Sequence, residues 1–260
     1  MSKKQKANIH FSIGAKGGIS KSFIAALIAE FLLEQNGTVK VYDTDPNNHT
    51  ISDIETLPNV TFLNIMPEGN DIKISKFDDL ILHLLQENKE MHDVVVDIGA
   101  TTFSPIYSYI VENSTFELLA STYNIFIHIP IVGGEAMMDT LNGMDQMIEA
   151  FQDSCTYIVW TNPHFGELKT AEGKTFEELP EYIKHKEKIF GLIRMPQRSS
   201  LFDEAIEKLK KSKKLFKDVD MDPSFNILEK SRLSMTKNDY FSMMSMVIPT
   251  DNKNSKKEDE

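Results

Sequence analysis

Short apolar runs alternate with longer amphipathic segments along most of this chain. Strand-like runs rich in Val, Ile, Phe and Tyr occupy residues 8–13, 38–41, 59–65, 93–100, 123–132, 155–161 and 189–193. Apolar residues recur at helical spacing over residues 23–33, 77–85, 135–151, 201–215 and 226–248. A chain in which strands and helices alternate predicts an α/β fold, with a doubly wound, mostly parallel sheet and helices on both faces.

The composition indicates one large globular domain. The chain has 260 residues, of which 41% are hydrophobic, and this is enough for a substantial core. We expect a single domain over residues 8–248, an N-terminal tail at 1–7 and a disordered polar tail at 249–260. Cys155, the single cysteine, lies in an apolar run and is expected to be a small buried hydrophobic residue.

Charge and targeting signals narrow the possible functions. The net charge of −11 argues against a broad electrostatic surface for nucleic acid. The one dense basic group, within residues 208–214, is typical of a solvated helix face, so direct DNA binding is not supported. We find no signal peptide and no apolar run of membrane-spanning length, and the last turns of the C-terminal helix lack the basic residues of a membrane-surface helix. We therefore expect a cytoplasmic protein that does not bind membranes.

A glycine-rich turn joins the first predicted strand to the first predicted helix. Residues 14–20 form the turn, and Lys21 and Ser22 open the helix. A helix N-terminus presents free N–H groups and a positive dipole end, which suit an anion. Lys21 would add a charge on the terminal phosphates of a nucleotide, and the Ser22 hydroxyl would ligate Mg²⁺. The standard pattern G-x-x-x-x-G-K-[ST] is incomplete here, because Ala15 and Ser20 occupy its two glycine positions.

Carboxylates end two of the later strands. Asp43 and Asp45 follow the second strand, just before Pro46, and Asp97 interrupts the run of valines in the fourth. In doubly wound sheets ligands bind at these carboxyl ends, where acids can hold a hydrated Mg²⁺ and orient an attacking water. From spacing alone, a polar turn at residues 43–46 is an equal alternative. We expect residues 99–102 to form the segment that senses a terminal phosphate.

The turn KGGISKS at residues 16–22 resembles the deviant phosphate loop K-G-G-x-G-K-[ST] of the ParA/MinD family of P-loop ATPases. In that alignment Lys16 matches the family's signature lysine, and Ser20 stands where the family has glycine. The resemblance implies ATP and Mg²⁺ as cofactors, and a homodimer when ATP is bound. The nucleotide-binding residues it implies are Gly17, Gly18, Ile19, Ser20, Lys21, Ser22 and Phe23.

The resemblance also implies roles for the charged side chains. Lys16 would reach the phosphates of the partner copy and act in catalysis, while Asp45 would assist hydrolysis. Ser22, Asp43 and Asp97 would hold the metal. Asn162 follows the sixth strand, where ParA-like proteins place an asparagine beside the adenine base of the nucleotide. The alternative is that Asn162 is a simple turn residue.

Three further stretches, at residues 42–48, 133–144 and 159–178, resemble the conjugal-transfer and plasmid-stability branch of ParA-like ATPases, the TraL/StbB type. This resemblance covers residues 7–235. It implies a slow ATPase that acts as a switch in plasmid transfer or plasmid stability, with a protein partner from that system.

Two other hypotheses remain open. The first is a pseudo-ATPase binding module of the same fold, because a serine at position 20 strains the loop and crowds the phosphate. The second is a P-loop enzyme of metabolism, for which the sequence offers no second-substrate motif. ATP affinity separates the switch from the binding module.

Overall fold

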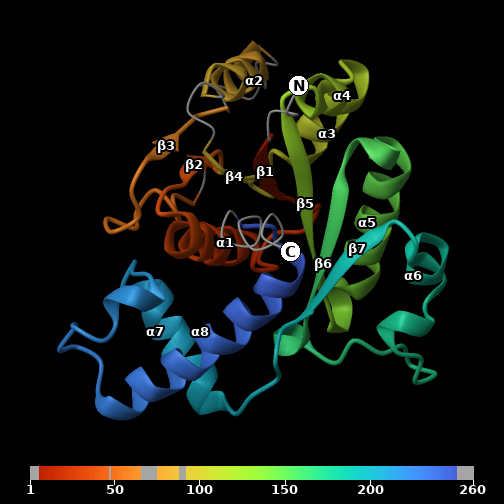
Figure 1. Cartoon of the computed structure of the whole chain (residues 1–260). Coiled ribbons are helices and arrows are strands. Elements are labelled where there is room, and N and C mark those ends of the chain that lie inside the picture. The colour runs from red at the N-terminus through yellow and green to blue at the C-terminus, as the bar shows by residue number, and fades with distance from the viewer. Residues whose placement is uncertain (1–5, 47, 66–74, 88–91, 251–260) are drawn as a thin grey trace, which may run out of the picture.

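The computed structural model describes residues 6–46, 48–65, 75–87 and 92–250. Seven parallel strands form one sheet in the order β3-β2-β4-β1-β5-β6-β7. Figure 1 shows helices on both sides of this sheet. The predicted fold class, a doubly wound parallel sheet between two helical layers, is confirmed.

The strands and helices follow the predicted order. The strands are β1 (Ala7–Ser12), β2 (Lys40–Asp43), β3 (Val60–Phe62), β4 (Val94–Asp97), β5 (Tyr123–Val132), β6 (Thr156–Asn162) and β7 (Ile189–Arg194). The helices are α1 (Lys21–Asn36), α2 (Ser75–Glu87), α3 (Phe103–Glu112), α4 (Thr115–Ala120), α5 (Met137–Phe151), α6 (Pro180–His185), α7 (Ser200–Lys211) and α8 (Ile227–Val247). The helices α3, α4 and α6 were not predicted.

Alternation along the strands divides the core into two layers. On β1, Ile9 and Phe11 face a cluster built with α2, α3, α4 and α5. On β4 and β5, Val95 and Phe126 face the opposite cluster, built with α1, α7 and α8. Figure 1 shows α1, α7 and α8 together on one side of the sheet. Strands β2, β4, β5 and β6 therefore contribute apolar residues to both layers, whereas β1 contributes to the first layer only.

The strand register brings three polar side chains together at the carboxyl ends of the central strands. Asp97 at the end of β4 pairs with Ser12 of β1 on one side and with Asp43 of β2 on the other. All three are buried, and alternation from Val95 places Asp97 on the α1 face. The glycine-rich turn at residues 14–20, called here the phosphate-loop turn, follows β1 at this same end of the sheet, so the acids and the turn lie together.

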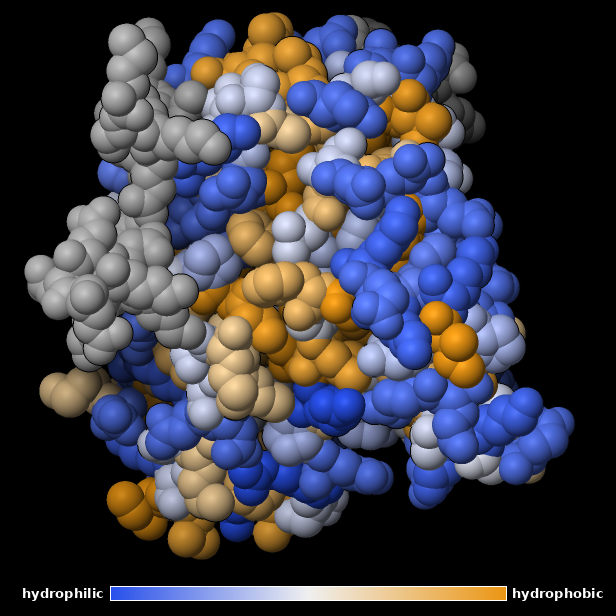
Figure 2. Space-filling view, turned by 45° about the vertical axis from the view of Figure 1, so that its right-hand side comes forward, coloured by the Kyte–Doolittle hydropathy of each residue, from blue (hydrophilic) through white to orange (hydrophobic). Residues whose placement is uncertain are grey.

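The far edge of the sheet is β7, which pairs only with β6 among the described strands. Phe190 of β7 is 63% exposed. Figure 2, which brings this side of the molecule forward, shows apolar side chains near the middle of the face with polar side chains around them. None of the described helices is both long and apolar enough to cross a bilayer.

The predicted tails fall mostly outside the described residues. Residues 1–5 of the N-terminal tail and residues 251–260 of the C-terminal tail are not described. Ala7, assigned to the tail, is the first residue of β1. Ile248 and Thr250 are buried, so the folded chain extends at least to residue 250.

Candidate functional site

The turn between β1 and α1 contains two residues with left-handed backbone. Gly18 has φ 73° and Ser20 has φ 74°. Glycine adopts this conformation freely, but a residue with a Cβ loses about 1–2 kcal/mol there. Ser20 therefore carries backbone strain that lowers the stability of the fold. The Ser20 carbonyl accepts from the Ile24 N–H at 2.9 Å and begins α1.

The first turn of α1 is fixed to the sheet and carries a buried lysine. The Ser12 hydroxyl donates to the Lys21 carbonyl at 2.8 Å. The Lys21 ammonium is buried and donates to the Lys16 carbonyl at 2.6 Å, which closes the turn into a ring. Burial lowers the pKa of Lys21, while the charges of Asp97 and Asp45 oppose that shift. A cation is therefore held beneath the turn with two carboxylates near it.

Asp97 is the least satisfied polar group at the site. Both of its carboxylate oxygens are buried, and neither has a hydrogen-bond partner among the residues described. Burial raises its pKa to about 7; the nearby Ser22 hydroxyl and Lys21 partly offset this shift, while Asp43 and Asp45 add to it. The Ser22 hydroxyl lies close to Asp97 but is not placed to satisfy either oxygen. A buried carboxylate without a partner is costly, so this position fits a cation or its water shell.

Asp43 and Asp45 differ in what they bind. The Asp43 carboxylate accepts from the Ser52 hydroxyl at 2.7 Å, from the Ser52 N–H at 3.0 Å and from the Asp45 N–H at 3.1 Å. It therefore holds Asp45 and Ser52 in place. Asp45 accepts from the Asn48 N–H at 3.2 Å. A Cβ at Gly99 would lie 3.0 Å from the Asp45 Cα, so only glycine lets these two segments approach so closely.

The donor set suits Mg²⁺. Ser22 supplies a hydroxyl and Asp97 a free carboxylate, and hard oxygen ligands of this kind are those that Mg²⁺ prefers. Asp43 already makes three hydrogen bonds, so its part is to support the neighbouring segment. Of the three metal residues predicted from the sequence, the structure thus brings all to one edge and leaves Asp97 as the unsatisfied carboxylate.

The phosphate-loop turn forms the floor of a cavity of about 750 Å³. Gly17, Gly18, Ile19, Ser20, Lys21, Ser22 and Phe23 all line it, and so does Asp45. The opposite wall is the end of α7 and the segment after it, which contribute four lysines. A cavity between a helix N-terminus and a row of lysines favours an anionic ligand.

Those lysines belong to the basic group identified in the sequence. Lys208 pairs with Glu229 at 2.7 Å, Lys210 with Glu207 at 2.8 Å and Lys213 with Asp53 at 2.7 Å. Lys214 also pairs with Asp222. Lys210, Lys211, Lys213 and Lys214 line the cavity. Three of the four lysines that line the cavity are therefore paired with carboxylates, and the expected solvated helix face describes only part of the group.

A buried glutamate anchors that wall to α1. Glu30 accepts from the backbone N–H groups of Phe216 at 2.9 Å and Lys217 at 2.7 Å. Burial raises the pKa of Glu30, and these two hydrogen bonds oppose the shift. Glu30 lies within the apolar run that predicted α1, and the periodicity alone gave no reason to assign it this contact.

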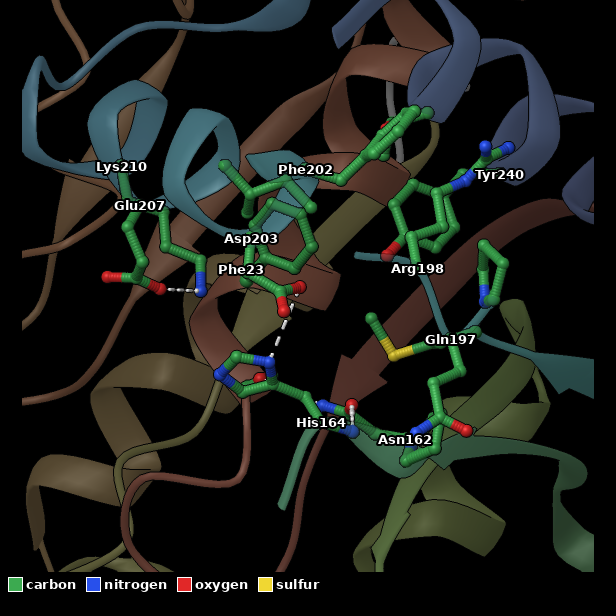
Figure 3. Close-up of a pocket in the computed structure, with 16 residues that line it drawn as sticks. Phe23, Asn162, His164, Gln197, Arg198, Phe202, Asp203, Glu207, Lys210 and Tyr240 are labelled. Carbon is green, nitrogen blue, oxygen red and sulfur yellow. Dashed lines mark hydrogen bonds and ion pairs between the residues drawn. The ribbon is translucent and has the colours of Figure 1, made fainter. Parts of the chain in front are cut away.

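A second, smaller cavity of about 130 Å³ adjoins the first at Ser20 and Phe23. Figure 3 shows Asn162 and Gln197 at one end of it and Lys210 at the other. The His164 ring lies 3.5 Å from the Asp203 carboxylate, and Tyr240 and Phe202 close the far side. Of the residues that line this cavity, Ser20, Phe23 and Asn162 were predicted from the sequence as site residues.

Asn162 connects the two cavities. Its amide nitrogen donates to the Ser20 hydroxyl at 3.2 Å, and its oxygen accepts from the His164 N–H at 3.0 Å. The second bond is that of a turn residue, which was the alternative interpretation of this asparagine. The position beside the smaller cavity fits the base-binding interpretation as well.

Lys16 points away from the cavity floor. Its ammonium pairs with Asp139 of α5 at 2.9 Å, and both side chains are about half exposed. The pKa of Lys16 is raised by this partner. An exposed ion pair contributes little to stability, so the lysine can exchange Asp139 for another anion at small cost.

Comparison with known proteins agrees with this geometry. No family model matches the chain. Two TraL proteins of Escherichia coli are 32% and 31% identical over 240 residues, which cover 92% of this chain and 97% of each relative.

Among solved structures, the MinD cell division protein of Aquifex aeolicus has a TM-score of 0.51 at 15% identity, and the match covers 94% of this chain and 100% of that one. The MinC:MinD complex from the same organism gives the same TM-score and covers 98% of its chain. The structural likeness establishes the fold, and the sequence identity establishes the relationship. This chain belongs to the TraL family and has the fold of MinD.

Proposed function

We propose that this protein is an ATP-controlled switch, a slow Mg²⁺-dependent ATPase acting in plasmid conjugal transfer or plasmid stability. The observation that carries the proposal is the meeting of a buried lysine, Lys21, with an unsatisfied buried carboxylate, Asp97, beneath a phosphate-loop turn. Lys21 has only a neutral carbonyl as its described hydrogen-bond acceptor, and a metal-bound polyphosphate would balance both buried charges. The relationship to TraL supports the assignment to plasmid biology.

In this proposal the turn binds the phosphates through its backbone N–H groups and through Lys21. Bound Mg²⁺ would neutralise phosphate charge, with Ser22 and Asp97 as the residues that hold it. Asp45, fixed by Asp43 and close to Gly99, orients a water toward the terminal phosphate. Phe23 and Asn162 face the base side of the cavity.

Lys16 supports a nucleotide-controlled dimer. Its side chain is exposed on the loop, and its only described ion-pair partner is the exposed Asp139. In a two-copy assembly Lys16 leaves Asp139 for the phosphates of the partner copy. Because MinD has been solved in complex with the protein MinC, this proposal also includes a protein partner that binds the dimeric form of this chain.

Calorimetric titration with Mg·ATP tests the nucleotide site. We expect wild-type protein to bind, Lys21→Ala to lose at least about 100-fold in affinity because a buried charge-assisted contact is removed, and the exposed-lysine control Lys188→Ala to bind as wild type. Absence of binding by the wild type would contradict the switch. It would favour the binding-module alternative, to which the strained Ser20 points.

Sedimentation with a slowly hydrolysed ATP analogue tests the dimer. We expect the wild type to dimerise, Lys16→Ala to remain monomeric with nucleotide affinity reduced less than tenfold, and Asp139→Ala to dimerise at least as well as wild type. If Lys16→Ala dimerises at the same protein concentrations as the wild type, this lysine does not have the proposed role.

A further inference from the structure

The amide of Asn162 is held at both ends. Its oxygen accepts from the His164 N–H at 3.0 Å, and its nitrogen donates to the Ser20 hydroxyl at 3.2 Å. A backbone N–H can only donate, so the amide oxygen must be the end that faces His164. The side chain is 3% exposed, so water does not compete for these contacts.

Ser20 is available for this contact because of its backbone. Although it occupies the N-cap of α1, its hydroxyl caps no helical N–H. The left-handed conformation directs the side chain toward β6, where Asn162 ends the strand. A glycine at this position, as in the ParA/MinD loop pattern, has no group that could make the bond.

The locked amide retains one N–H and one oxygen lone pair for a ligand. The Watson–Crick edge of adenine presents an amino donor beside a ring-nitrogen acceptor. Guanine presents the reverse pair, a carbonyl acceptor beside a ring N–H donor. An asparagine amide can match either edge if it is free to flip, so fixing its orientation determines which base it accepts.

We propose that Ser20 is a specificity-determining residue, which holds the Asn162 amide in one orientation and thereby sets the preference of the site between adenine and guanine nucleotides; the proposed ATP site gives the direction of that preference, towards adenine. The inference rests on the proposed nucleotide site. His164 sets the orientation, and Ser20 keeps the side chain from rotating out of it. Ser20, the residue that departs from the loop pattern, thus links the phosphate loop to the smaller cavity, and it lines both cavities.

The test is the ratio of the GDP and ADP dissociation constants, measured by titration of the full chain with each nucleotide in Mg²⁺. We expect a wild-type ratio well above one. Ser20→Ala and Ser20→Gly should both lower it about three- to tenfold, the equivalent of one hydrogen bond. The two variants differ in backbone strain, so an equal fall in both separates the hydroxyl from the strain.

A double-mutant cycle tests the link itself. Asn162→Ala should lower the ratio, and adding Ser20→Ala to it should have no further effect, because the partner is already gone. Gln197→Ala removes an exposed amide from the same cavity and serves as the matched control, whose effect should add to that of Ser20→Ala.

The outcomes separate this inference from the proposed function. ADP binding with an unchanged ratio in both Ser20 variants would overturn the inference and leave the nucleotide site standing. A wild-type ratio near one would also overturn it. Failure of the wild type to bind either nucleotide would overturn the nucleotide site and the inference together.

Discussion

The two faces of the sheet are built from the same strands but differ in their chemistry. The face covered by α2, α3, α4 and α5 is apolar along the central strands, with residues such as Ile127 fully buried. The face covered by α1, α7 and α8 buries His10, His128 and Asp97 among its apolar residues. The first face contributes stability, while the second gives up stability to hold polar groups at the edge where the phosphate loop lies.

Two buried histidines on the polar face are held by hydrogen bonds to neighbouring side chains. The Trp160 N–H donates to one nitrogen of His128 at 3.0 Å, and the other nitrogen lies 2.9 Å from a His10 nitrogen. Burial lowers the pKa of His10 to about 3, so this chain of rings stays uncharged. Both oxygens of Asp97 lack a partner among the described residues, as does the second nitrogen of His10, but only Asp97 is a carboxylate beside Lys21 and Ser22. Substitutions at four positions, with one control, test this contrast.

The largest effect is expected on the apolar face. Ile127→Ala should lower the free energy of unfolding by about 3–4 kcal/mol, because a fully buried side chain leaves a cavity at the centre of the sheet. Urea unfolding measures the loss. Nucleotide affinity of the folded fraction should change less than threefold, and a larger change would show that the two faces are not separable.

Asp97→Asn should change stability in the opposite direction. The pKa of Asp97 is raised to about 7 in the folded chain, against about 4 when unfolded, so the folded state holds a proton that the unfolded state loses between these values. The stability that comes from binding this proton is therefore complete below pH 4 and is lost as the pH rises to about 7. The variant removes this loss and should be about 2 kcal/mol more stable than wild type at pH 8 without nucleotide or metal.

Urea unfolding at pH 5 and pH 8, with a chelator present, measures this difference. The gain in the variant should shrink at pH 5, where the wild-type carboxyl is protonated. An equal gain at both pH values would mean that charge burial is not its cause.

Glu30→Ala should destabilise the polar face by about 2 kcal/mol. The substitution leaves the N–H groups of Phe216 and Lys217 without their acceptor, and a buried donor without a partner costs about 1–3 kcal/mol. Glu34→Ala, one turn further along α1 and more exposed, is the matched control and should cost less than 1 kcal/mol. Thermal unfolding of both variants compares them, and equal losses would remove the anchoring role of Glu30.

The smallest effect is expected at Ser20. Ser20→Gly and Ser20→Ala both lose the hydroxyl, but only glycine relieves the left-handed backbone. The glycine variant should therefore be about 1 kcal/mol more stable than the alanine variant. Chemical unfolding of the pair checks this, and the reverse order would show that residue 20 is not left-handed in solution.

The fold could be predicted from the sequence because its signals are local. The strand at 123–132 was predicted with the bounds of β5, and the runs around Val95 and Phe11 gave the central strands. The helices α3, α4 and α6 were not predicted, because the segment before α3 was interpreted only as a phosphate sensor and residues 166–188 as a polar insertion. Short helices that follow a polar turn give weak periodicity.

The part of the candidate site beside the turn was predictable from the sequence, and the smaller cavity was much less so. The residues from Lys16 to Ser22 are contiguous, and Asp43, Asp45 and Asp97 stand at strand ends, so their sequence positions place them. His164, Arg198 and Tyr240 come from three separate segments that only the tertiary fold assembles. The signal available for His164 was its place two residues after Asn162.

The most direct test of this account is the stability of wild type and Asp97→Asn at pH 8, each with and without Mg·ATP. We predict that the variant is the more stable protein alone, and that Mg·ATP stabilises the wild type by several degrees in melting temperature while leaving the variant nearly unchanged. If Mg·ATP stabilises both proteins equally, or the variant is the less stable one alone, then Asp97 is a structural residue and the central claim is wrong.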